Sequence, residues 1–282
     1  MDGIYLVNKP ASMTSFDVVY KIRKALGIRS VGHTGTLDPQ ATGVLVILCG
    51  KATKALPYLS GEAKEYVAEL TLGIRTDTGD IWGKTVETRE IPQFDENRAR
   101  EALNHFLGQT MQLPPMVSAI KKNGRKLYEY AREGVEIERE RRPIEITEIE
   151  LLRLQPVLRF RVVCSAGTYV RSLCEDIAQQ LATVGTMSSL VRTRACGYSL
   201  TQCQSLDDIL AGKGQPVSLR EALAARWPWI EVDEVQQAAI RNGKKIRLNH
   251  QADTLAALTS GEALAMLKRQ DDGLYRVLRG LW

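Results

Sequence analysis

The sequence contains no uninterrupted apolar run near 18 residues, the length that a helix needs to cross a bilayer. Its N-terminal stretch, MDGIYLVNKP, lacks the basic, apolar and small-residue segments of a secretory signal. The two absences argue against a protein that crosses the membrane by a helix or is exported through such a signal. We therefore expect a cytoplasmic protein.

Cysteine and histidine are few and scattered. The five cysteines include no C-x-x-C pair, and the three histidines stand far apart. In a cytoplasmic protein this pattern indicates reduced thiols rather than a disulfide framework. A structural zinc site would need paired cysteines or histidines at short spacing. We therefore expect no metal site.

The motifs of common nucleotide-binding and hydrolytic enzymes are also missing. The stretch GVLVILCGKAT resembles a phosphate loop, but six residues separate its glycines, and Ala52 stands where a magnesium-binding Ser or Thr would follow Lys51. There is no G-x-G-x-x-G, no G-x-S-x-G and no evident pair of catalytic carboxylates. We therefore expect no cofactor.

What is present is a chain of 282 residues with 44% apolar content, enough for one large domain and a smaller one. The net charge is only +5, but 22 residues from Lys121 to Arg142 hold eight basic residues against five Glu, a local excess of +3. Tyr128 and Tyr130 are interleaved with these charges. Such a segment suits a phosphate backbone and unstacked bases. A solvated, salt-bridged helix is the alternative, and charge alone favours it.

Hydrophobic periodicity predicts helices and strands in irregular order. The helix at SFDVVYKIRKALG follows the N-cap candidates Thr14 and Ser15, and the helix at DENRAREALNHFLG should bury Phe106 and stop at Gly108. We expect helices over 15–26, 95–107, 167–182 and 233–246, and strands over 3–10, 44–49, 64–73, 143–154, 158–165 and 188–200.

This order, without regular βαβ alternation, predicts an α+β fold and argues against a doubly wound parallel sheet. Residues 114–142 form a basic excursion from the main body, with a Pro-Pro break, a short strand, an Asn-Gly turn and a helical run. From about residue 231 a short helix and short strands predict a small β-rich module. We expect domains over 1–230 and 231–282.

The most conspicuous reactive candidate is Asp38, in GHTGTLDPQATGVLVI. The glycines around it permit unusual backbone angles, and Pro39 fixes the next φ. A nucleophilic carboxylate must be ionised and oriented, which favours a cationic partner. Arg171, at the start of an expected helix, is a candidate. Taken alone, however, an Asp in such a turn most often only hydrogen-bonds nearby backbone.

Five ordered segments, which together span residues 1 to about 200, resemble the TruB family of tRNA pseudouridine synthases. The resemblance implies a sheet core of pseudouridine-synthase type, mixed or antiparallel and flanked by helices, with a PUA-like RNA-binding module at the C-terminal end. The segments are NKPASMTSFDVV, GHTGTLDPQATGVL, KEYVAELTLGIRTDTGD, KKNGRKLYEYAREG and CSAGTYVRSL.

The resemblance implies that Asp38 is the catalytic aspartate, which attacks the ribose or otherwise assists cleavage of the C1′–N1 bond. Tyr66 matches the tyrosine that stacks on the target uracil and takes the proton from C5. Arg171 matches the arginine that pairs with the catalytic carboxylate. The activity so implied is isomerisation of uridine to pseudouridine at position 55, in the T loop of tRNA.

Substrate-binding positions are implied in the same way. His33 matches a histidine that inserts among T-loop bases, Lys9 a lysine that supports the site, and Tyr169 and Leu190 residues lining the uracil pocket beside Tyr66. The basic excursion matches a thumb that closes over the tRNA.

The partner implied is a tRNA stem-loop bound by a monomer, without cofactor or metal. Ala166 departs from the family, because many relatives carry a lysine there. A non-catalytic RNA-binding or RNA-folding protein using the same cleft is the alternative.

Overall fold

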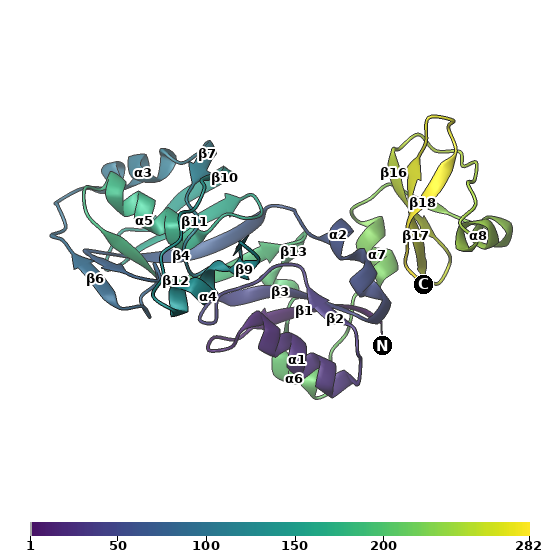
Figure 1. Ribbon diagram of the computed structural model, residues 1–282, viewed down its shortest axis with the longest axis horizontal. Coiled ribbons are helices and arrows are strands. Elements are labelled where there is room, and N and C mark those ends of the chain that lie inside the picture. The colour runs from purple at the N-terminus through teal and green to yellow at the C-terminus, as the bar shows by residue number, and fades with distance from the viewer. Residues whose placement is uncertain (1) are drawn as a thin grey trace. The chain divides into compact units, whose positions relative to one another are not determined.

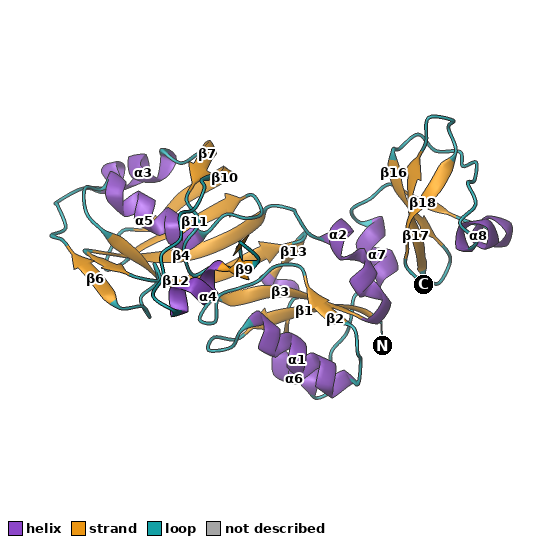
Figure 2. Cartoon of the chain, in the orientation of Figure 1, coloured by secondary structure: helices purple, strands orange, loops and turns teal. Residues whose placement is uncertain are grey.

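A computed structural model describes residues 2–282, which form two compact units. Unit 1 comprises the residues up to Gly61 together with Cys196–Trp282, and unit 2 comprises Glu62–Ala195. Both units combine helices with strands, as Figures 1 and 2 show. The pairing is mostly antiparallel with two parallel pairs, which confirms the predicted α+β class.

The first part of unit 1 is a small sheet covered by helices. Strand β1 (Gly3–Lys9) pairs antiparallel with β3 (Thr42–Cys49), which also pairs with β2 (Val31–His33), while β14 (Gln204–Ser205) runs parallel to β1. Helices α1 (Ser15–Leu26) and α6 (Leu206–Leu210) lie side by side against it (Figure 1). Their apolar faces form one core with the sheet, which includes Val7, Val18, Ile22, Leu45 and Ile209.

Helix α1 begins and ends at the predicted positions. The Thr14 hydroxyl accepts a hydrogen bond from the Asp17 N–H at 3.0 Å, and the Asp17 carboxylate accepts one from the Thr14 N–H at 2.9 Å. This reciprocal capping box satisfies two amides at the helix start. Gly27, with φ at +63°, ends the helix in the left-handed conformation that glycine adopts without steric cost.

The remainder of unit 1 contains the strand-rich C-terminal module. Its sheet has the order β15 (Trp229–Glu231), β16 (Thr254–Leu258), β17 (Ala263–Arg269) and β18 (Tyr275–Gly280), beside α8 (Glu234–Arg241). The Trp227 indole N–H donates to the Tyr58 carbonyl at 2.9 Å, which ties the chain before this sheet to α2 (Leu56–Leu59). A C-terminal β-rich module is thus confirmed, while the boundary at residue 231 stays a prediction.

Unit 2 is built on an antiparallel sheet of five strands in the order β12-β4-β11-β10-β7. Helix α5 (Val170–Gln180) packs against β12 and β4, and α3 (Glu96–Asn104) packs against β10 (Figure 1). The strands are β4 (Lys64–Leu72), β7 (Gly108–Gln112), β10 (Arg142–Arg153), β11 (Leu158–Cys164) and β12 (Gly185–Ala195).

The predicted end of the helix near residue 107 is wrong. Helix α3 ends at Asn104, and two turns of 3₁₀ type follow. The Phe106 N–H donates to the Leu103 carbonyl, and the Leu107 N–H donates to the Asn104 carbonyl. Gly108, with φ at +89°, does not cap the helix but starts β7. Pairing of β7 with β10 therefore overrides continued helical propensity.

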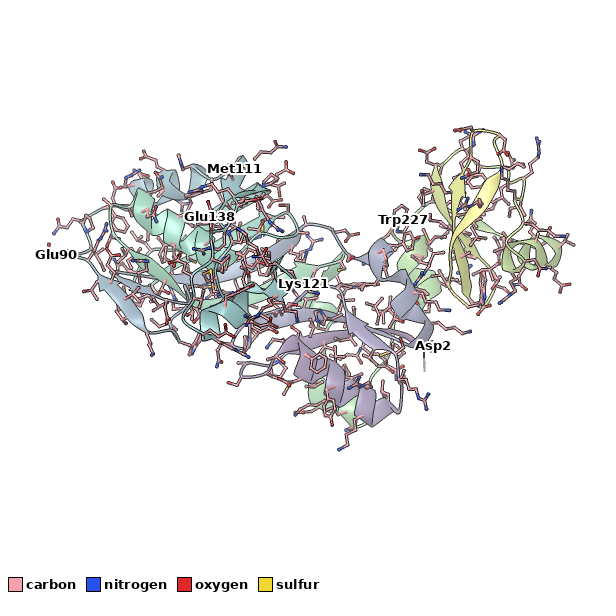
Figure 3. All side chains as sticks on the ribbon, viewed as in Figure 1. Asp2, Glu90, Met111, Lys121, Glu138 and Trp227 are labelled. Carbon is pink, nitrogen blue, oxygen red and sulfur yellow. The ribbon has the colours of Figure 1, made fainter. Side chains whose placement is uncertain are left out.

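The basic excursion folds as its pattern predicts. Strands β8 (Lys121–Lys122) and β9 (Arg125–Lys126) form a hairpin whose two turn residues, Asn123 and Gly124, both have positive φ. Helix α4 (Leu127–Arg132) follows, and Figure 3 labels Lys121 and Glu138 among the side chains of this segment. The other elements are η1 (Gly50–Ala55), β5 (Ile74–Thr76), β6 (Thr85–Thr88), β13 (Tyr198–Ser199), η2 (Leu200–Gln202) and α7 (Leu219–Ala224).

Within residues 2–282, no helix is both long and apolar enough to cross a membrane.

Candidate functional site

Asp38 lies in the loop between β2 and β3, and the backbone on both sides of it is held in place. The Leu37 N–H donates to the Ser15 hydroxyl at 2.9 Å, and that hydroxyl donates to the Leu37 carbonyl at 3.2 Å. The Asp38 carbonyl accepts from the Ala41 N–H at 3.1 Å. Leu37 is buried while Asp38 is only half-buried, so the loop anchors one residue and presents the next.

Lys9 holds the other side of the same loop. Its ammonium group is fully buried and donates to the carbonyls of Pro10, Met13 and Pro39 at 2.7, 2.5 and 2.9 Å. Three carbonyl dipoles replace the water that a buried ammonium loses, which makes burial of the charge tolerable. Lys9 therefore joins the end of β1 to the residue that follows Asp38.

His33, at the end of β2, stands in register with Ile47 of β3 and is half-buried. The next residue, Thr34, donates its N–H to the Val46 carbonyl at 3.2 Å, and its hydroxyl accepts from the Cys196 thiol at 3.2 Å. The chain between His33 and Asp38 therefore starts from a fixed strand end.

In unit 2, Tyr66 lies on β4 between Val162 of β11 and Arg192 of β12, and its side chain is 7% exposed. Leu190, also buried, stands opposite Ala68 on the same strand pair. Both positions thus belong to the sheet, two residues apart along its strands.

Glu65, next to Tyr66, is the centre of an ionic network. Its carboxylate accepts from the Arg161 guanidinium at 2.9 and 2.7 Å and from the Thr193 hydroxyl at 2.7 Å. Burial raises the pKa of Glu65, but the hydrogen bonds from Thr193 and Arg161 outweigh it and leave that pKa below its ordinary value. The network fixes the strand end that carries Tyr66.

Arg171 lies in the first turn of α5 and is 4% exposed. Its two terminal nitrogens diverge, because Nη1 donates to the Thr78 carbonyl and Nη2 to the Val117 carbonyl, both at 2.8 Å. One guanidinium thus joins the turn after β5 to the start of the basic excursion. A planar guanidinium suits hydrogen bonds to two separate carbonyls better than a lysine ammonium does.

The structure also shows two positioning groups that sequence reasoning missed. Of the two N-cap candidates, Thr14 caps α1, while the Ser15 hydroxyl bonds the backbone of Leu37. Gln112 bonds the backbone of Tyr169 with both ends of its amide. A serine at a helix start and a glutamine at a strand end carry no distinctive signal in a single sequence.

The predicted site residues fall on both units. Lys9, His33 and Asp38 belong to unit 1, where Lys9 bonds the residue after Asp38. The others belong to unit 2, where Tyr169 and Arg171 lie at the start of one helix and Tyr66 and Leu190 share a strand pair.

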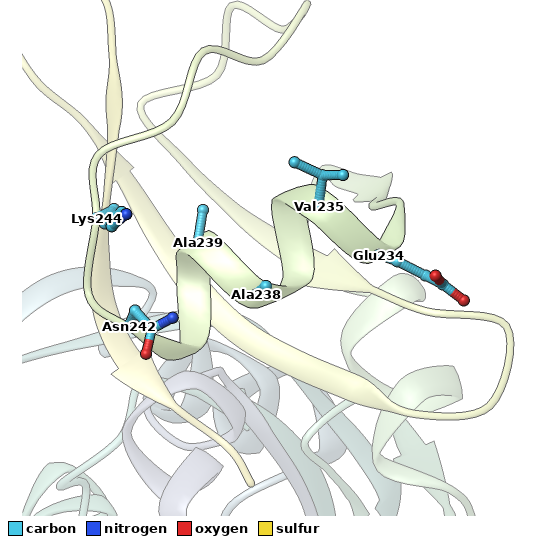
Figure 4. Close-up of a pocket in the computed structure, with 6 residues that line it drawn as sticks. All are labelled: Glu234, Val235, Ala238, Ala239, Asn242 and Lys244. Carbon is cyan, nitrogen blue, oxygen red and sulfur yellow. The ribbon is translucent and has the colours of Figure 1, made fainter.

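A hollow of about 430 Å³ lies along α8, none of these residues lines it, and Figure 4 shows its lining. It is formed by Glu234, Val235, Ala238, Ala239, Asn242 and Lys244. Among residues 2–282, no three His, Cys, Asp or Glu side chains are arranged to hold a metal ion.

Two carboxylates on α5, Glu175 and Asp176, are half-buried. Burial raises the pKa of each, although Arg75 lowers that of Glu175 and Arg141 lowers that of Asp176. Asp176 lines a second pocket of about 140 Å³ together with Gln112 and Arg141.

Replacing Asp176 with Asn should stabilise the protein at pH 8. A raised pKa in the folded state means that the fold binds the proton more tightly than the unfolded chain, so the ionised group is a destabilising one. This loss of folding stability is fully present above the pKa of the folded state and disappears below the pKa of the unfolded state. We expect Asp176→Asn to raise Tm by a few degrees at pH 8, with the gain shrinking toward pH 4. Equal Tm values for Asp176→Asn and wild type at pH 8 would contradict this prediction. The same gain in Tm from the exposed control Glu150→Gln would contradict it too.

Comparison with known proteins agrees over most of the chain. Residues 23–170 match the TruB family pseudouridylate synthase (N terminal domain). The tRNA pseudouridine synthase B of Clostridium tetani is 42% identical over 259 residues, covering 91% of this chain and 90% of that protein. The enzyme of the same name from Bacillus subtilis is 41% identical, covering 94% of this chain and 89% of that protein.

Among solved structures, a chain of a Cbf5-Nop10-Gar1 complex superposes with a TM-score of 0.74 at 25% identity. The match covers 99% of this chain and 85% of that one. The fold described above is therefore that of known pseudouridine synthases.

Proposed function

Since the chain belongs to the TruB family of pseudouridylate synthases, we propose that it isomerises uridine to pseudouridine in tRNA. The observation that carries this proposal is the mounting of Asp38. Ser15 and Lys9 fix the backbone on either side of it, while the aspartate itself stays half-buried. A carboxylate held in this way can meet the same atom of each bound substrate.

The reaction needs no co-reactant. The C1′–N1 bond of uridine breaks, the freed uracil turns, and a bond forms between C1′ and C5. C5 loses its proton and N1 gains one, so the product is an isomer of the substrate. Asp38 assists cleavage at C1′. Tyr66 is the aromatic face for the uracil and takes the proton from C5, and stacking of this kind contributes about 1–3 kcal/mol per base. Arg171 supplies the positive charge for the catalytic carboxylate.

The remaining predicted residues bind the RNA. We infer that the target is the uridine at position 55 of the T loop, flipped out of its stack at a cost of a few kcal/mol. His33 enters the gap left among the loop bases, Tyr169 and Leu190 line the uracil pocket, and Lys9 supports the Asp38 loop. We further predict a cytoplasmic enzyme that acts as a monomer.

Mapping pseudouridine in an unmodified tRNA transcript after incubation with the protein tests the proposal directly. We expect one product, at position 55, and no product in a matched transcript with cytidine there. A non-catalytic RNA-folding protein, the alternative left by the sequence, would bind both transcripts and modify neither. Product at another uridine would contradict the T-loop assignment while leaving the activity intact.

The basic excursion should contribute binding energy through charge. Arg125 forms an ion pair with Glu133 and stacks on Tyr130 at 4.6 Å, and Lys126 lies 5.4 Å from the ring of Tyr128. Cations next to tyrosine rings suit phosphates and unstacked bases.

Neutralising Lys121, Lys122, Arg125 and Lys126 to Gln should weaken tRNA binding by about tenfold or more. The slope of log affinity against log salt should flatten by roughly one for each phosphate that the variant no longer neutralises. Binding is measured between low and physiological salt, with Arg98→Gln/Arg100→Gln on α3 as the control. An unchanged salt slope would show that the segment is only a solvated surface.

A further inference from the structure

Gln112 is the last residue of β7, next to Met111, which Figure 3 labels, and its side chain is 3% exposed. Its Nε2 donates to the Tyr169 carbonyl at 3.0 Å, and its Oε1 accepts from the Tyr169 N–H at 2.8 Å. The amide thus bonds Tyr169 as a neighbouring strand would, with one donor and one acceptor side by side.

Tyr169 depends on this contact for its backbone orientation. It is the N-cap of α5, in an extended conformation, and its own side chain makes no capping hydrogen bond. Its carbonyl also accepts the first bond of the helix, from the Leu173 N–H at 3.1 Å. Its N–H donates to Gln112, so loss of that acceptor leaves a half-buried donor without this partner.

The residues that follow Gln112 are held by the same helix start. The Ser172 hydroxyl donates to the Leu113 carbonyl at 3.0 Å, and the Arg171 guanidinium donates to the Val117 carbonyl at 2.8 Å. Residues 112–117 and 169–172 therefore form one hydrogen-bonded frame, which includes the first residues of the basic excursion. Within this frame, Gln112 bonds both the N–H and the carbonyl of Tyr169.

We propose that Gln112 is a positioning residue for the reaction, which rests on the function proposed above. It sets the direction of the Tyr169 backbone, and through it the start of the helix that carries Arg171. The group does not touch substrate. Its contribution is geometric, and a displacement near 1 Å at a reacting centre slows catalysis by about 100-fold.

The test compares Gln112→Leu, in which the side chain has a similar size and lacks both polar atoms, with the same substitution at a second glutamine that bonds a backbone in this way. Gln204 bonds the backbone of Gln215 in the same way, with Nε2 donating at 2.8 Å and Oε1 accepting at 2.7 Å. Three quantities are measured: the single-turnover rate of pseudouridine formation at saturating protein, the Kd for tRNA and Tm. We expect Gln112→Leu to lower the rate about 100-fold with Kd nearly unchanged, and Gln204→Leu to keep the wild-type rate.

Gln112→Glu separates positioning from simple packing and serves even where Gln112→Leu does not fold. A neutral carboxylic acid can donate and accept as the amide does, whereas a carboxylate only accepts and repels the Tyr169 carbonyl. Arg141 and Asp176 line the same pocket as residue 112, so burial and the Asp176 carboxylate favour the neutral form of a Glu there and Arg141 favours the ionised form. The neutral fraction of this Glu grows as pH falls. The rate of Gln112→Glu relative to wild type should therefore rise as pH falls from 8 to 5.5, by up to about tenfold per unit.

A wild-type rate for Gln112→Leu, or a Gln112→Glu rate whose ratio to wild type does not vary with pH, would overturn the positioning role while wild-type activity stands. Absence of product with the wild-type protein would instead overturn the proposed function, and this inference with it.

Discussion

Asp38→Asn should abolish pseudouridine formation while tRNA affinity stays within about threefold of wild type. We expect the single-turnover rate to fall about 10⁴-fold or more, because loss of a group on which covalent catalysis depends has effects of this size. The substitution exchanges one carboxylate oxygen for an amide nitrogen of nearly the same shape. A rate within about tenfold of wild type would exclude Asp38 from the chemistry.

Several bonds on either side of Asp38 run through the backbone and stay available in this variant. The Leu37 N–H and carbonyl bond the Ser15 hydroxyl, the Asp38 carbonyl accepts from the Ala41 N–H, and the Pro39 carbonyl accepts from Lys9. An unchanged Tm and unchanged RNA affinity would verify that only the reactive group has been removed.

Much of this fold follows from local sequence rules. The capped helix α1, the Asn-Gly hairpin of the excursion and the alternating strand β4 all appear where composition and periodicity place them. In each case the signal lies within a few residues, in a cap, a turn or a period of two. Local physics is then sufficient, because no distant contact competes with it.

The features that local rules missed depend on contacts between residues far apart in the sequence. Helix α3 stops early because β7 pairs with β10, a contact between residues 30 to 38 positions apart. Ser15, one of two cap candidates, bonds Leu37, 22 positions away, and Gln112 bonds Tyr169, 57 positions away. These are bonds across the fold that a helix or turn rule does not see. Residues that hold a loop or a helix start through such bonds are therefore not found by local rules.

Lys9 illustrates the same limit from another side. A lysine before a proline suggests an exposed loop, since lysine is seldom fully buried. The structure buries it and surrounds its ammonium with three carbonyls from two loops. Only the family resemblance pointed to a role for it at the sequence level.

The second large effect should come from Arg171, where charge and shape can be separated. Arg171→Met removes both, and Arg171→Lys keeps the charge but cannot reach two carbonyls in different directions. We expect the single-turnover rate to fall about 10³-fold in Arg171→Met and about 10²-fold in Arg171→Lys, because we propose that the charge of Arg171 stabilises the catalytic carboxylate. Both variants should also lower Tm, since each leaves the carbonyls of Thr78 and Val117 without this donor.

The comparison between the two variants is what identifies the role. If Arg171 only joined the Thr78 turn to Val117, the rates per RNA-bound molecule would match wild type in both, and only Tm would fall. The matched control is Arg98→Lys, because Arg98 donates to the Gln180 carbonyl in the same unit and lies outside both the proposed site and the basic excursion. A lower Tm at an unchanged rate in that control, beside a graded rate loss at position 171, would assign the charge of Arg171 to the reaction itself.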